Sequence, residues 1–322
     1  SAQPDGPAYY WYRRQLIVPD PKPQHQAVIM FGAADWHTDV WADGSLIASN
    51  QGGYLPFEAV LPRELHGKST TLTVRVWDAP LFPTRTVEPP HSDSFDSAWL
   101  PRGKQHWYGE CSGIWQPIHL LVRPEARIGG VKTDLEPDLE TVRISVLGKS
   151  STPGSLRVQV RPLGGGSVVW ESSNNGSLDK GIDIEHHWSE ISPWSPNTPT
   201  LYQLDASFSQ NGVTDTQTYI TGFRSIHSDE ERLWLNGSPL YLRGALDQDY
   251  HPVTGFAYPG DEALQKRFGA ARDAGLNLLR CHVKLPDPRY LSLADRFGLL
   301  VWYELPSWGH PTTPPGGVPE WL

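Results

Sequence analysis

The fold of the C-terminal tail is decided by residues 276–304, LNLLRCHVKLPDPRYLSLADRFGLLVWYE, in which two apolar runs flank one helix. The first run is apolar enough for a parallel strand that is buried on both faces. The helix begins at Asp287–Pro288, a cap followed by a first-turn proline, and ends at Gly298. Its expected buried stripe is Leu291, Ala294 and Phe297. Residues 299–304 form the next strand.

A hairpin and another strand-helix unit come before this stretch. Residues 233–235 and 240–242 flank Asn236–Gly237, which readily takes the positive φ angles of a two-residue turn. A strand is expected to run on through residues 243–246, and a helix begins at residue 261 and stops at Gly275. The expected buried face of this helix is Leu264, Phe268 and Ala271. Strand-helix alternation with short links predicts right-handed parallel units, which open a (β/α)8 barrel.

Polar and aromatic residues gather where these strands end, and active sites of such barrels lie at the C-terminal ends of the strands. Charge beside aromatic rings favours a site for a sugar or another polyol. The alternative is that these are solvated loop residues. The candidate substrate-binding residues are Asp247, Asp249, Tyr250, Arg280, His282, Lys284, Glu304 and Trp308.

Composition excludes several classes of protein. The 322 residues carry a net charge of -9 without a basic run, so neither nucleic acid nor an anionic membrane is expected as a partner. No apolar stretch reaches the ~20 residues of a membrane span, so we expect a soluble protein, whether cytoplasmic, periplasmic or secreted. The two cysteines, Cys111 and Cys281, fall in different expected domains, which excludes a disulfide framework.

Residues 1–124 have the pattern of an all-β domain. Asp43–Gly44 predicts a hairpin turn, and apolar residues alternate with polar ones over residues 72–77 and again over 118–122, as in half-buried strands. Residues 80–105 form a long aperiodic loop of the kind that often carries function. After this loop, Trp107, Tyr108 and Glu110 are candidates for contact with a sugar. Core packing of Trp107 and Trp115 is the alternative.

A second β domain covers residues 125–228. Its apolar residues alternate over 142–146 and 156–160, and Gly164–Gly166 predicts a turn. About one hundred residues of short strands fit an immunoglobulin-like sandwich. Because no cluster of residues here demands chemistry, we interpret this domain as a spacer.

The order of these pieces resembles glycoside hydrolase family 2, the group of β-galactosidases, β-glucuronidases and β-mannosidases. The similarity rests on motifs spread over nearly the whole chain: 53–57 (GYLPF), 107–115 (WYGECSGIW), 199–202 with 222–224, 235–237 (LNG), 242–244 (LRG), 275–282 and 294–304. The architecture that the resemblance implies is a jelly-roll sugar-binding domain over 1–124, an immunoglobulin-like sandwich over 125–228, and the first three strands of a TIM barrel, cut short, over 229–322.

The resemblance also implies retaining hydrolysis by two glutamates, one following an Asn at barrel strand four and one ending strand seven. No Asn-Glu dipeptide occurs in the chain, so neither catalytic residue can be assigned. By position, Arg280 matches the family's strand-two arginine and Glu304 its strand-three acid. The runs at 245–250 and 282–284 depart from the family's galactosidase and glucuronidase patterns, so the resemblance names no sugar.

We therefore expect the N-terminal portion of a retaining exo-β-glycosidase that is inactive alone. Its expected partners are a β-glycoside or oligosaccharide and the remainder of the barrel, or a second chain, to cover the exposed strand edge. A non-catalytic carbohydrate-binding protein and a structural part that assembles as a homo-oligomer are the alternatives. Glu304 and His310 could both reach the barrel mouth, but two ligands alone make only a slight case for Mg²⁺ or Ca²⁺, and solvated loop residues are the favoured interpretation.

Overall fold

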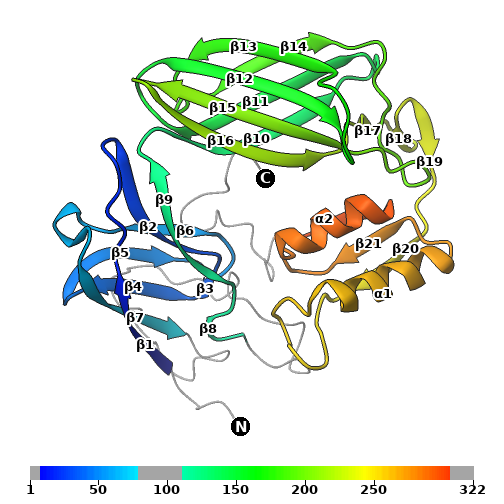
Figure 1. Cartoon of the computed structure of the whole chain (residues 1–322). Coiled ribbons are helices and arrows are strands. Elements are labelled where there is room, and N and C mark those ends of the chain that lie inside the picture. Colours follow the sequence, from blue (N-terminus) through cyan, green and yellow to red (C-terminus); the bar gives the residue numbers. More distant parts are fainter. Residues whose placement is uncertain (1–7, 79–110, 305–322) are drawn as a thin grey trace.

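In a computed structural model of the protein, residues 8–78 and 111–304 are described. Over these residues the chain is mainly β, with two α-helices near its C-terminal end. Figure 1 shows two bodies built of strands and a smaller body built of both helices and short strands.

The first body contains two sheets that share one apolar core. One sheet has the order β1-β7-β4-β5 and the other β6-β2-β9, and β3 pairs with β8 beside them. The strands are β1 (Ala8–Ile17), β2 (His25–Phe31), β3 (Ala34–Asp35), β4 (His37–Ala42), β5 (Ser45–Gln51), β6 (Phe57–Val60), β7 (Ser69–Asp78), β8 (Gly113–Ile114) and β9 (Ile118–Pro124).

Sequence alternation predicted the strands of this body well and their burial less well. Leu72, Val74 and Val76 are buried on β7, and Asp43 and Gly44 have φ angles of 45° and 86° in the predicted turn. The strand predicted at 118–122 forms, but the prediction that it is half-buried is wrong. Its apolar side chains are 39 to 45% exposed, because among the described residues β9 lies at the edge of its sheet.

The second body is a sandwich of antiparallel sheets, β10-β11-β14 and β13-β12-β15-β16. The strands are β10 (Arg127–Leu135), β11 (Thr141–Lys149), β12 (Gly154–Pro162), β13 (Trp170–Gly176), β14 (Ile182–His187), β15 (Tyr202–Gln210) and β16 (Val213–Thr221). The alternating residues predicted at 142–146 and 156–160 are all buried in its core. The core therefore forms between the inner faces of both sheets, as the period-two pattern requires.

A cluster of charges links the two β bodies. Glu58 on β6 accepts hydrogen bonds from Arg123 at 2.8 Å and Lys149 at 3.0 Å, and it also pairs with the buried Arg127. Burial by itself would raise the pKa of Glu58. The hydrogen bonds from Lys149 and Arg127 outweigh that effect and hold the pKa below its ordinary value.

The third body begins with the predicted hairpin and continues into three parallel strands in the order β20-β21-β22. Asn236 and Gly237 have φ angles of 49° and 70°, as the turn requires. The elements are β17 (Ile226–Ser228), β18 (Leu233–Leu235), β19 (Ser238–Leu240), β20 (Gly244–Asp247), α1 (Asp261–Asp273), β21 (Leu278–Cys281), α2 (Pro288–Phe297) and β22 (Leu300–Tyr303).

Both helices form where the sequence predicts them. The three residues expected on the buried face of α1 are all buried. Asp287 caps α2 by accepting a hydrogen bond from the backbone N–H of Arg289 at 2.9 Å, and Gly298 ends it in the left-handed conformation. The predicted stripe of α2 is wrong in detail: Ala294 is buried, but Leu291 and Phe297 are only half-buried.

The buried residues of α2 are instead Tyr290, Leu293 and Ala294. The helix is turned so that the Tyr290 ring packs edge-on against Phe268 of α1, with ring centroids 4.8 Å apart. Its hydroxyl group can then reach the end of β20. Packing between α1 and α2 therefore decides which face of α2 is buried.

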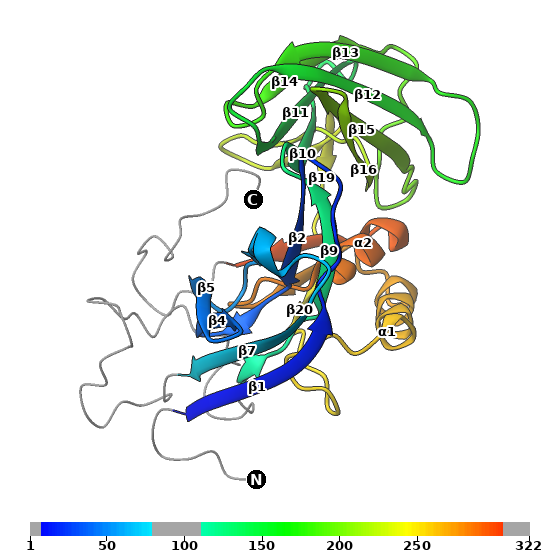
Figure 2. The same cartoon turned by 60° about the vertical axis from the view of Figure 1, so that its left-hand side comes forward.

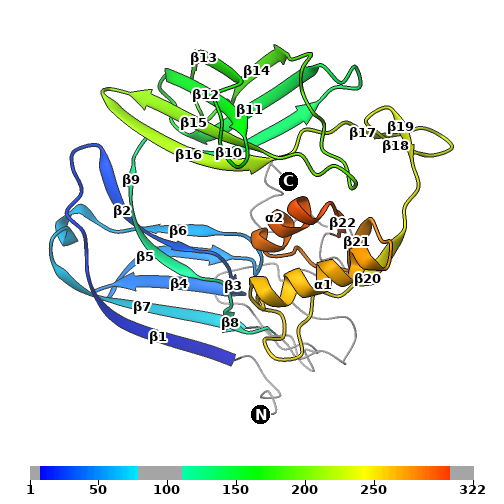
Figure 3. The same ribbon diagram turned by 45° about the vertical axis from the view of Figure 1, so that its right-hand side comes forward.

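Figures 1 and 3 show the helical body beside the first β body and below the second. Figure 2 shows strands β2 and β9 reaching from the first body toward the second. The indole N–H of Trp194 in the second body donates to the backbone carbonyl of Asp295 in α2 at 2.9 Å. Asn236 donates from the hairpin to the carbonyl of Trp194 at 3.0 Å. The loop around Trp194 therefore fixes the second body onto both the hairpin and α2.

Candidate functional site

Strand register divides the C-terminal ends of β20, β21 and β22 into two faces. Leu246, Arg280 and Trp302 lie opposite one another in the parallel pairing, and so do Asp247, Cys281 and Tyr303 on the next row. Because side chains alternate along a strand, the two rows point to opposite faces of the sheet. The first row is the open one: Leu246 is 50% exposed and Trp302 54%.

The open face carries an ion pair. The Arg280 guanidinium donates from Nε to Oε1 of Glu304 at 2.6 Å, and its Nη2 also pairs with this oxygen. The other carboxylate oxygen, Oε2, accepts the backbone N–H of Val283 at 3.0 Å, and the His282 ring nitrogen Nε2 lies 3.8 Å from it. Glu304 therefore gathers groups from β21 and the loop after it.

The backbone at this point is strained. Val283 has a φ angle of 52°, which is unusual for a β-branched residue. Such conformations persist where surrounding contacts enforce them, and they cluster at functional sites. The hydrogen bond from Val283 to Glu304 is one of these contacts. The strain therefore lies next to the Arg280–Glu304 pair.

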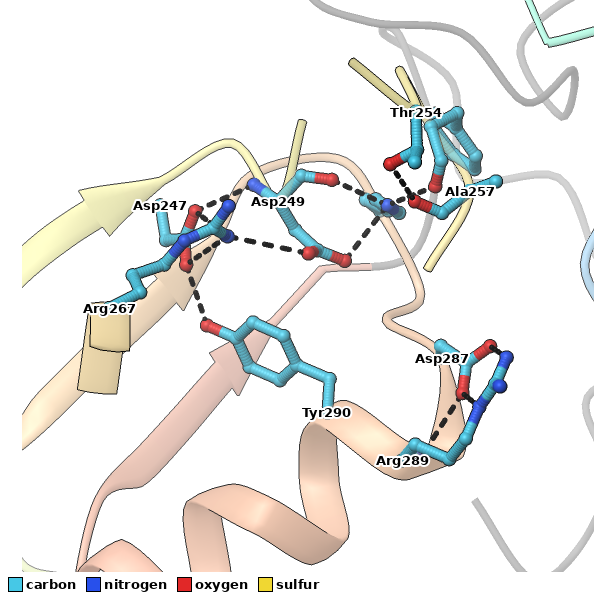
Figure 4. A network of polar contacts seen from close by, with 10 residues as sticks. Asp247, Asp249, Thr254, Ala257, Arg267, Asp287, Arg289 and Tyr290 are labelled. Carbon is cyan, nitrogen blue, oxygen red and sulfur yellow. Dashed lines mark hydrogen bonds and ion pairs between the residues drawn. The ribbon is translucent and has the colours of Figure 1, made fainter. Parts of the chain in front are cut away.

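Asp247 faces the helices and not the open side (Figure 4). Its carboxylate accepts the hydroxyl of Tyr290 at 2.9 Å and the Arg267 guanidinium at 3.2 Å from each oxygen. It also accepts the backbone N–H of Asp249 at 2.8 Å. This carboxylate therefore joins the end of β20 to α1 and α2.

Asp249 and Lys284 form a buried ion pair. The ammonium group lies 2.8 Å from Oδ2 of Asp249, and it donates to the backbone carbonyls of Asp249 at 2.6 Å and Phe256 at 3.0 Å. It also lies 4.0 Å from the centre of the Phe256 ring. Burial raises the pKa of Asp249, against the opposing effect of Lys284. Lys284 thus holds the loop after β20 against the loop after β21.

An aromatic cluster extends this contact to the first β body. Phe256 packs against Tyr54 and Trp115, with ring centroids 5.9 Å and 5.1 Å apart. The indole N–H of Trp115 donates to the carbonyl of Gly53 at 2.7 Å. Trp115 is therefore a packing residue, in agreement with the alternative stated for it. Tyr250 joins the cluster, with its ring centroid 6.5 Å from that of Phe256.

The predicted site residues thus fall into separate groups. Arg280, His282 and Glu304 come together on the open side of the sheet. Asp247, Asp249 and Lys284 form contacts inside the fold, and Tyr250 belongs to the aromatic cluster. The other predicted positions lie outside the described residues: Trp107, Tyr108, Glu110, Trp308 and His310.

Several residues at this site were missed in the sequence. Trp302 could have been found, because it lies two residues before Glu304 and alternation places both side chains on one face. Leu246 follows by the same argument on β20. No sequence pattern points to Arg267 or Phe256, since their partners, Asp247 and Lys284, are distant in the sequence.

Neither a metal site nor a membrane span is found in the described parts of the chain. No group of three or more His, Cys, Asp and Glu residues within 8–78 and 111–304 is placed to hold a metal ion. Over the same residues, no helix combines the length and apolar character needed to cross a bilayer. Both cysteines are buried and free, and burial raises the pKa of Cys281 to about 12.

Comparison with known proteins identifies relatives of this architecture. Residues 128–224 match the family described as glycosyl hydrolases family 2. A β-galactosidase of Vibrio vulnificus (strain YJ016) is 26% identical over 289 residues, which cover 85% of this chain and 26% of that protein. A β-glucuronidase of Mus musculus is 25% identical over 317 residues, 94% of this chain and 48% of that protein.

Solved structures show the same fold. A β-D-glucuronidase of Dictyoglomus thermophilum superposes with a TM-score of 0.73 at 21% identity, covering 94% of this chain and 51% of its own. The chain spans between about a quarter and a half of the length of the relatives it matches. The resemblance seen in the sequence is confirmed: residues 128–224 match the glycosyl hydrolases family 2 model, and nearly the whole chain is similar to β-galactosidases and β-glucuronidases.

Proposed function

We propose that this chain is the N-terminal portion of a retaining exo-β-glycosidase. In this proposal, residues 1–124 are a jelly-roll domain, 125–228 an immunoglobulin-like sandwich, and 229–322 the first three strands of a (β/α)8 barrel. The observation that carries it is the Arg280–Glu304 pair, which lies beside an exposed Trp302 at the C-terminal ends of parallel strands. Active sites of such barrels are built at these strand ends.

The ligand that suits this face is a β-linked pyranoside. A pyranose ring offers hydroxyl groups to charged donors and acceptors and a C–H face to an aromatic ring. Arg280, His282 and Glu304 would supply the polar contacts, and Trp302 would supply an apolar surface. A relative, β-glucuronidase from Ruminococcus gnavus, has been solved in complex with D-glucuronic acid, which supports a sugar ligand in this class of protein. Asp247, Asp249 and Lys284 act as positioning residues, since their charged groups are paired inside the fold, whereas the Arg280 side chain is 42% exposed.

Hydrolysis by this class of enzyme needs two carboxyl groups about 5 Å apart, one as acid/base and one as nucleophile. The family places both on later barrel strands, and the chain holds no Asn-Glu dipeptide to supply the first. Glu304 is occupied by Arg280 and the Val283 amide and is no candidate for the nucleophile on its own. This polypeptide is therefore inactive alone.

The remainder of the barrel, or a second chain, is the partner that completes the site. A cavity of about 600 Å³ opens between the hairpin, α2 and β22, and it is lined mainly by leucines with Trp194, Trp302 and Tyr303. Trp302 and Leu246 leave apolar surface exposed on the sheet. Further strands and helices packed here would cover both the cavity and the edge of β22.

The test is to assay the pure 322-residue chain, and the same chain co-expressed with a family 2 C-terminal barrel segment. The substrates are p-nitrophenyl β-D-galactoside, β-D-glucuronide and β-D-mannoside. We expect no turnover by the chain alone and turnover of one substrate by the complemented protein, lost on Arg280→Met. Turnover by the chain alone, at a rate proportional to its concentration, would overturn the proposal.

A non-catalytic carbohydrate-binding protein is the second candidate, favoured by the exposed Trp302 beside charged groups. Calorimetric titration of the chain with the three corresponding sugars separates the two functions. Binding without turnover, even in the complemented protein, would support this candidate.

A further inference from the structure

Aromatic side chains gather on the outer face of the first β body, on the sheet β1-β7-β4-β5. Tyr9 and Trp11 on the edge strand β1 are 51% and 60% exposed. They share a face with Trp41 because Trp11 lies opposite Arg75, and Arg75 lies opposite Asp39, two residues before Trp41 on β4. We refer to Tyr9, Trp11 and Trp41 as the aromatic platform.

The rings of the platform are held in place. Trp11 and Trp41 stack across β7 with centroids 5.8 Å apart and planes inclined by 22°. The Arg75 guanidinium lies 5.7, 5.7 and 5.4 Å from the rings of Tyr9, Trp11 and Trp41. Arg75 is itself fixed by an ion pair with the buried Asp39. The platform is therefore rigid before any ligand arrives, which lowers the entropic cost of binding.

An exposed arginine lies next to the platform. Arg13 follows Trp11 by two residues on β1, so alternation places it on the same face, and it is exposed. Within the described residues, Arg13 has neither an ion pair nor a hydrogen-bond acceptor for its side chain. The contrast with Arg75 is direct, because Arg75 is paired. The whole chain has a net charge of -9, but Arg13 gives this part of the surface a positive charge.

Core packing does not explain this arrangement. Single apolar residues on a surface are common, but the rings of Tyr9 and Trp11 lie beside one another and both are more than half exposed, which is unusual. Aromatic faces take up the C–H surfaces of pyranose rings, and a guanidinium group binds carboxylate strongly. We propose that the aromatic platform with Arg13 is a binding surface for a pyranose chain that carries carboxylate groups, such as a polyuronate. This surface lies on a different body from the Arg280–Glu304 site and does not depend on it.

The experiment titrates the 322-residue chain by calorimetry with oligogalacturonate and, in parallel, with a neutral cello-oligosaccharide. We expect oligogalacturonate to bind and the neutral sugar to bind at least about tenfold more weakly. Trp11→Ala should weaken the acidic ligand about tenfold or more. Arg13→Gln should remove most of the preference for the acidic ligand and the dependence of its affinity on salt. Tyr241→Ala, which alters an aromatic residue 78% exposed elsewhere, should leave both affinities unchanged.

Trp302→Ala separates this proposal from the proposed function, because it alters the strand-end site and leaves the platform intact. Unchanged binding of oligogalacturonate by Trp302→Ala, with binding lost in Trp11→Ala, supports the platform. Binding lost only in Trp302→Ala, or equal affinity for acidic and neutral sugars, overturns it. Sedimentation of the unaltered chain is the last check: a dimer that Trp11→Ala converts to monomer, with no sugar bound, would identify the platform as a contact between copies. Arg13→Gln, on an exposed side chain, keeps the test valid if Trp11→Ala fails to fold.

Discussion

Arg280 and Glu304 are joined by a hydrogen bond of 2.6 Å between Nε and Oε1, although 23 residues and a whole helix separate them in the chain. The same carboxylate also accepts the backbone N–H of Val283, whose φ angle is positive. One side chain thus joins two parallel strands and stabilises a strained loop. We expect Glu304→Ala to lower the free energy of unfolding by about 2–3 kcal/mol, the usual cost of losing a hydrogen bond to a charged group.

Glu304→Gln is the matched variant, since its amide oxygen can still accept the Val283 N–H. It should cost about half as much as Glu304→Ala when both are measured by urea unfolding followed by tryptophan fluorescence. Equal losses in the two variants would contradict the role given to the Val283 contact.

Removing the buried ammonium group should be costly. Lys284→Met leaves the Phe256 carbonyl without its donor and the Asp249 carboxylate with only the longer ion pair to Arg267, at 3.6 Å. Breaking a buried pair from one side costs about 3–5 kcal/mol. Asparagine tolerates the positive φ angle of residue 249, so Asp249→Asn removes the negative charge with little change in the backbone.

The double variant completes the cycle. Combining Lys284→Met with Asp249→Asn should destabilise the fold by less than the sum of the single changes, with a coupling energy of about 2 kcal/mol. Additive losses would show that the two groups do not act as a pair.

The contact between the first β body and the loop after β20 depends on Phe256. Phe256→Ala should cost about 3–5 kcal/mol because the ring is 96% buried against Tyr54 and Trp115. In differential scanning calorimetry of this variant, we expect the first β body and the helical body to unfold in separate transitions. Val253→Ala changes a residue of the same loop that is 86% exposed and should have no measurable effect. A single unshifted transition in Phe256→Ala would contradict the packing role.

Acid should weaken the joint between the two β bodies through Glu58. Its pKa in the fold lies below the ordinary value of 4.5, so the stabilisation is fully present above about pH 4.5 and is lost as pH falls through the lower folded pKa. Glu58→Gln should therefore destabilise the protein by about 3 kcal/mol at pH 7 and by progressively less below pH 4.5.

Glu185→Gln is the control for this change, because Glu185 pairs with Arg143 on the surface, where both side chains are more than half exposed. It should alter stability by less than about 0.5 kcal/mol at pH 7. A loss in Glu58→Gln that stays constant from pH 7 to pH 3 would show that charge is not the cause.

Two glycines that follow the helices give a matched pair of backbone tests. Gly275 and Gly298 have φ angles of 79° and 67°, so alanine at either position costs about 1 kcal/mol from conformation alone. A Cβ on Gly275 would meet nothing within 4 Å, whereas on Gly298 it would lie 2.3 Å from the backbone oxygen of Pro196. Gly298→Ala should therefore lower the melting temperature several degrees more than Gly275→Ala. Equal shifts would mean that the loop at Pro196 can move aside.

Local features of this protein could be predicted from its sequence. The turns at Asp43–Gly44 and Asn236–Gly237, the cap at Asp287 and the stop at Gly298 all form as expected, because each depends on the conformational preferences of neighbouring residues. The period-two and helical patterns likewise predicted the strand-helix order of the tail. The proximity of Arg280 and Glu304 followed from the rule that parallel strands align their carboxyl ends.

Packing between distant segments decided the rest. The sequence placed Asp247, Asp249 and Lys284 at one rim, but whether a carboxylate at a strand end faces ligand or helix depends on the partners that reach it. Tyr290 and Arg267 come from two helices, and their positions are set by core contacts such as Phe268. The exposure of the apolar side chains of β9 and the face of α2 that is buried were predicted wrongly for the same reason. Alternation specifies which residues share a face, and only the tertiary structure determines what that face meets.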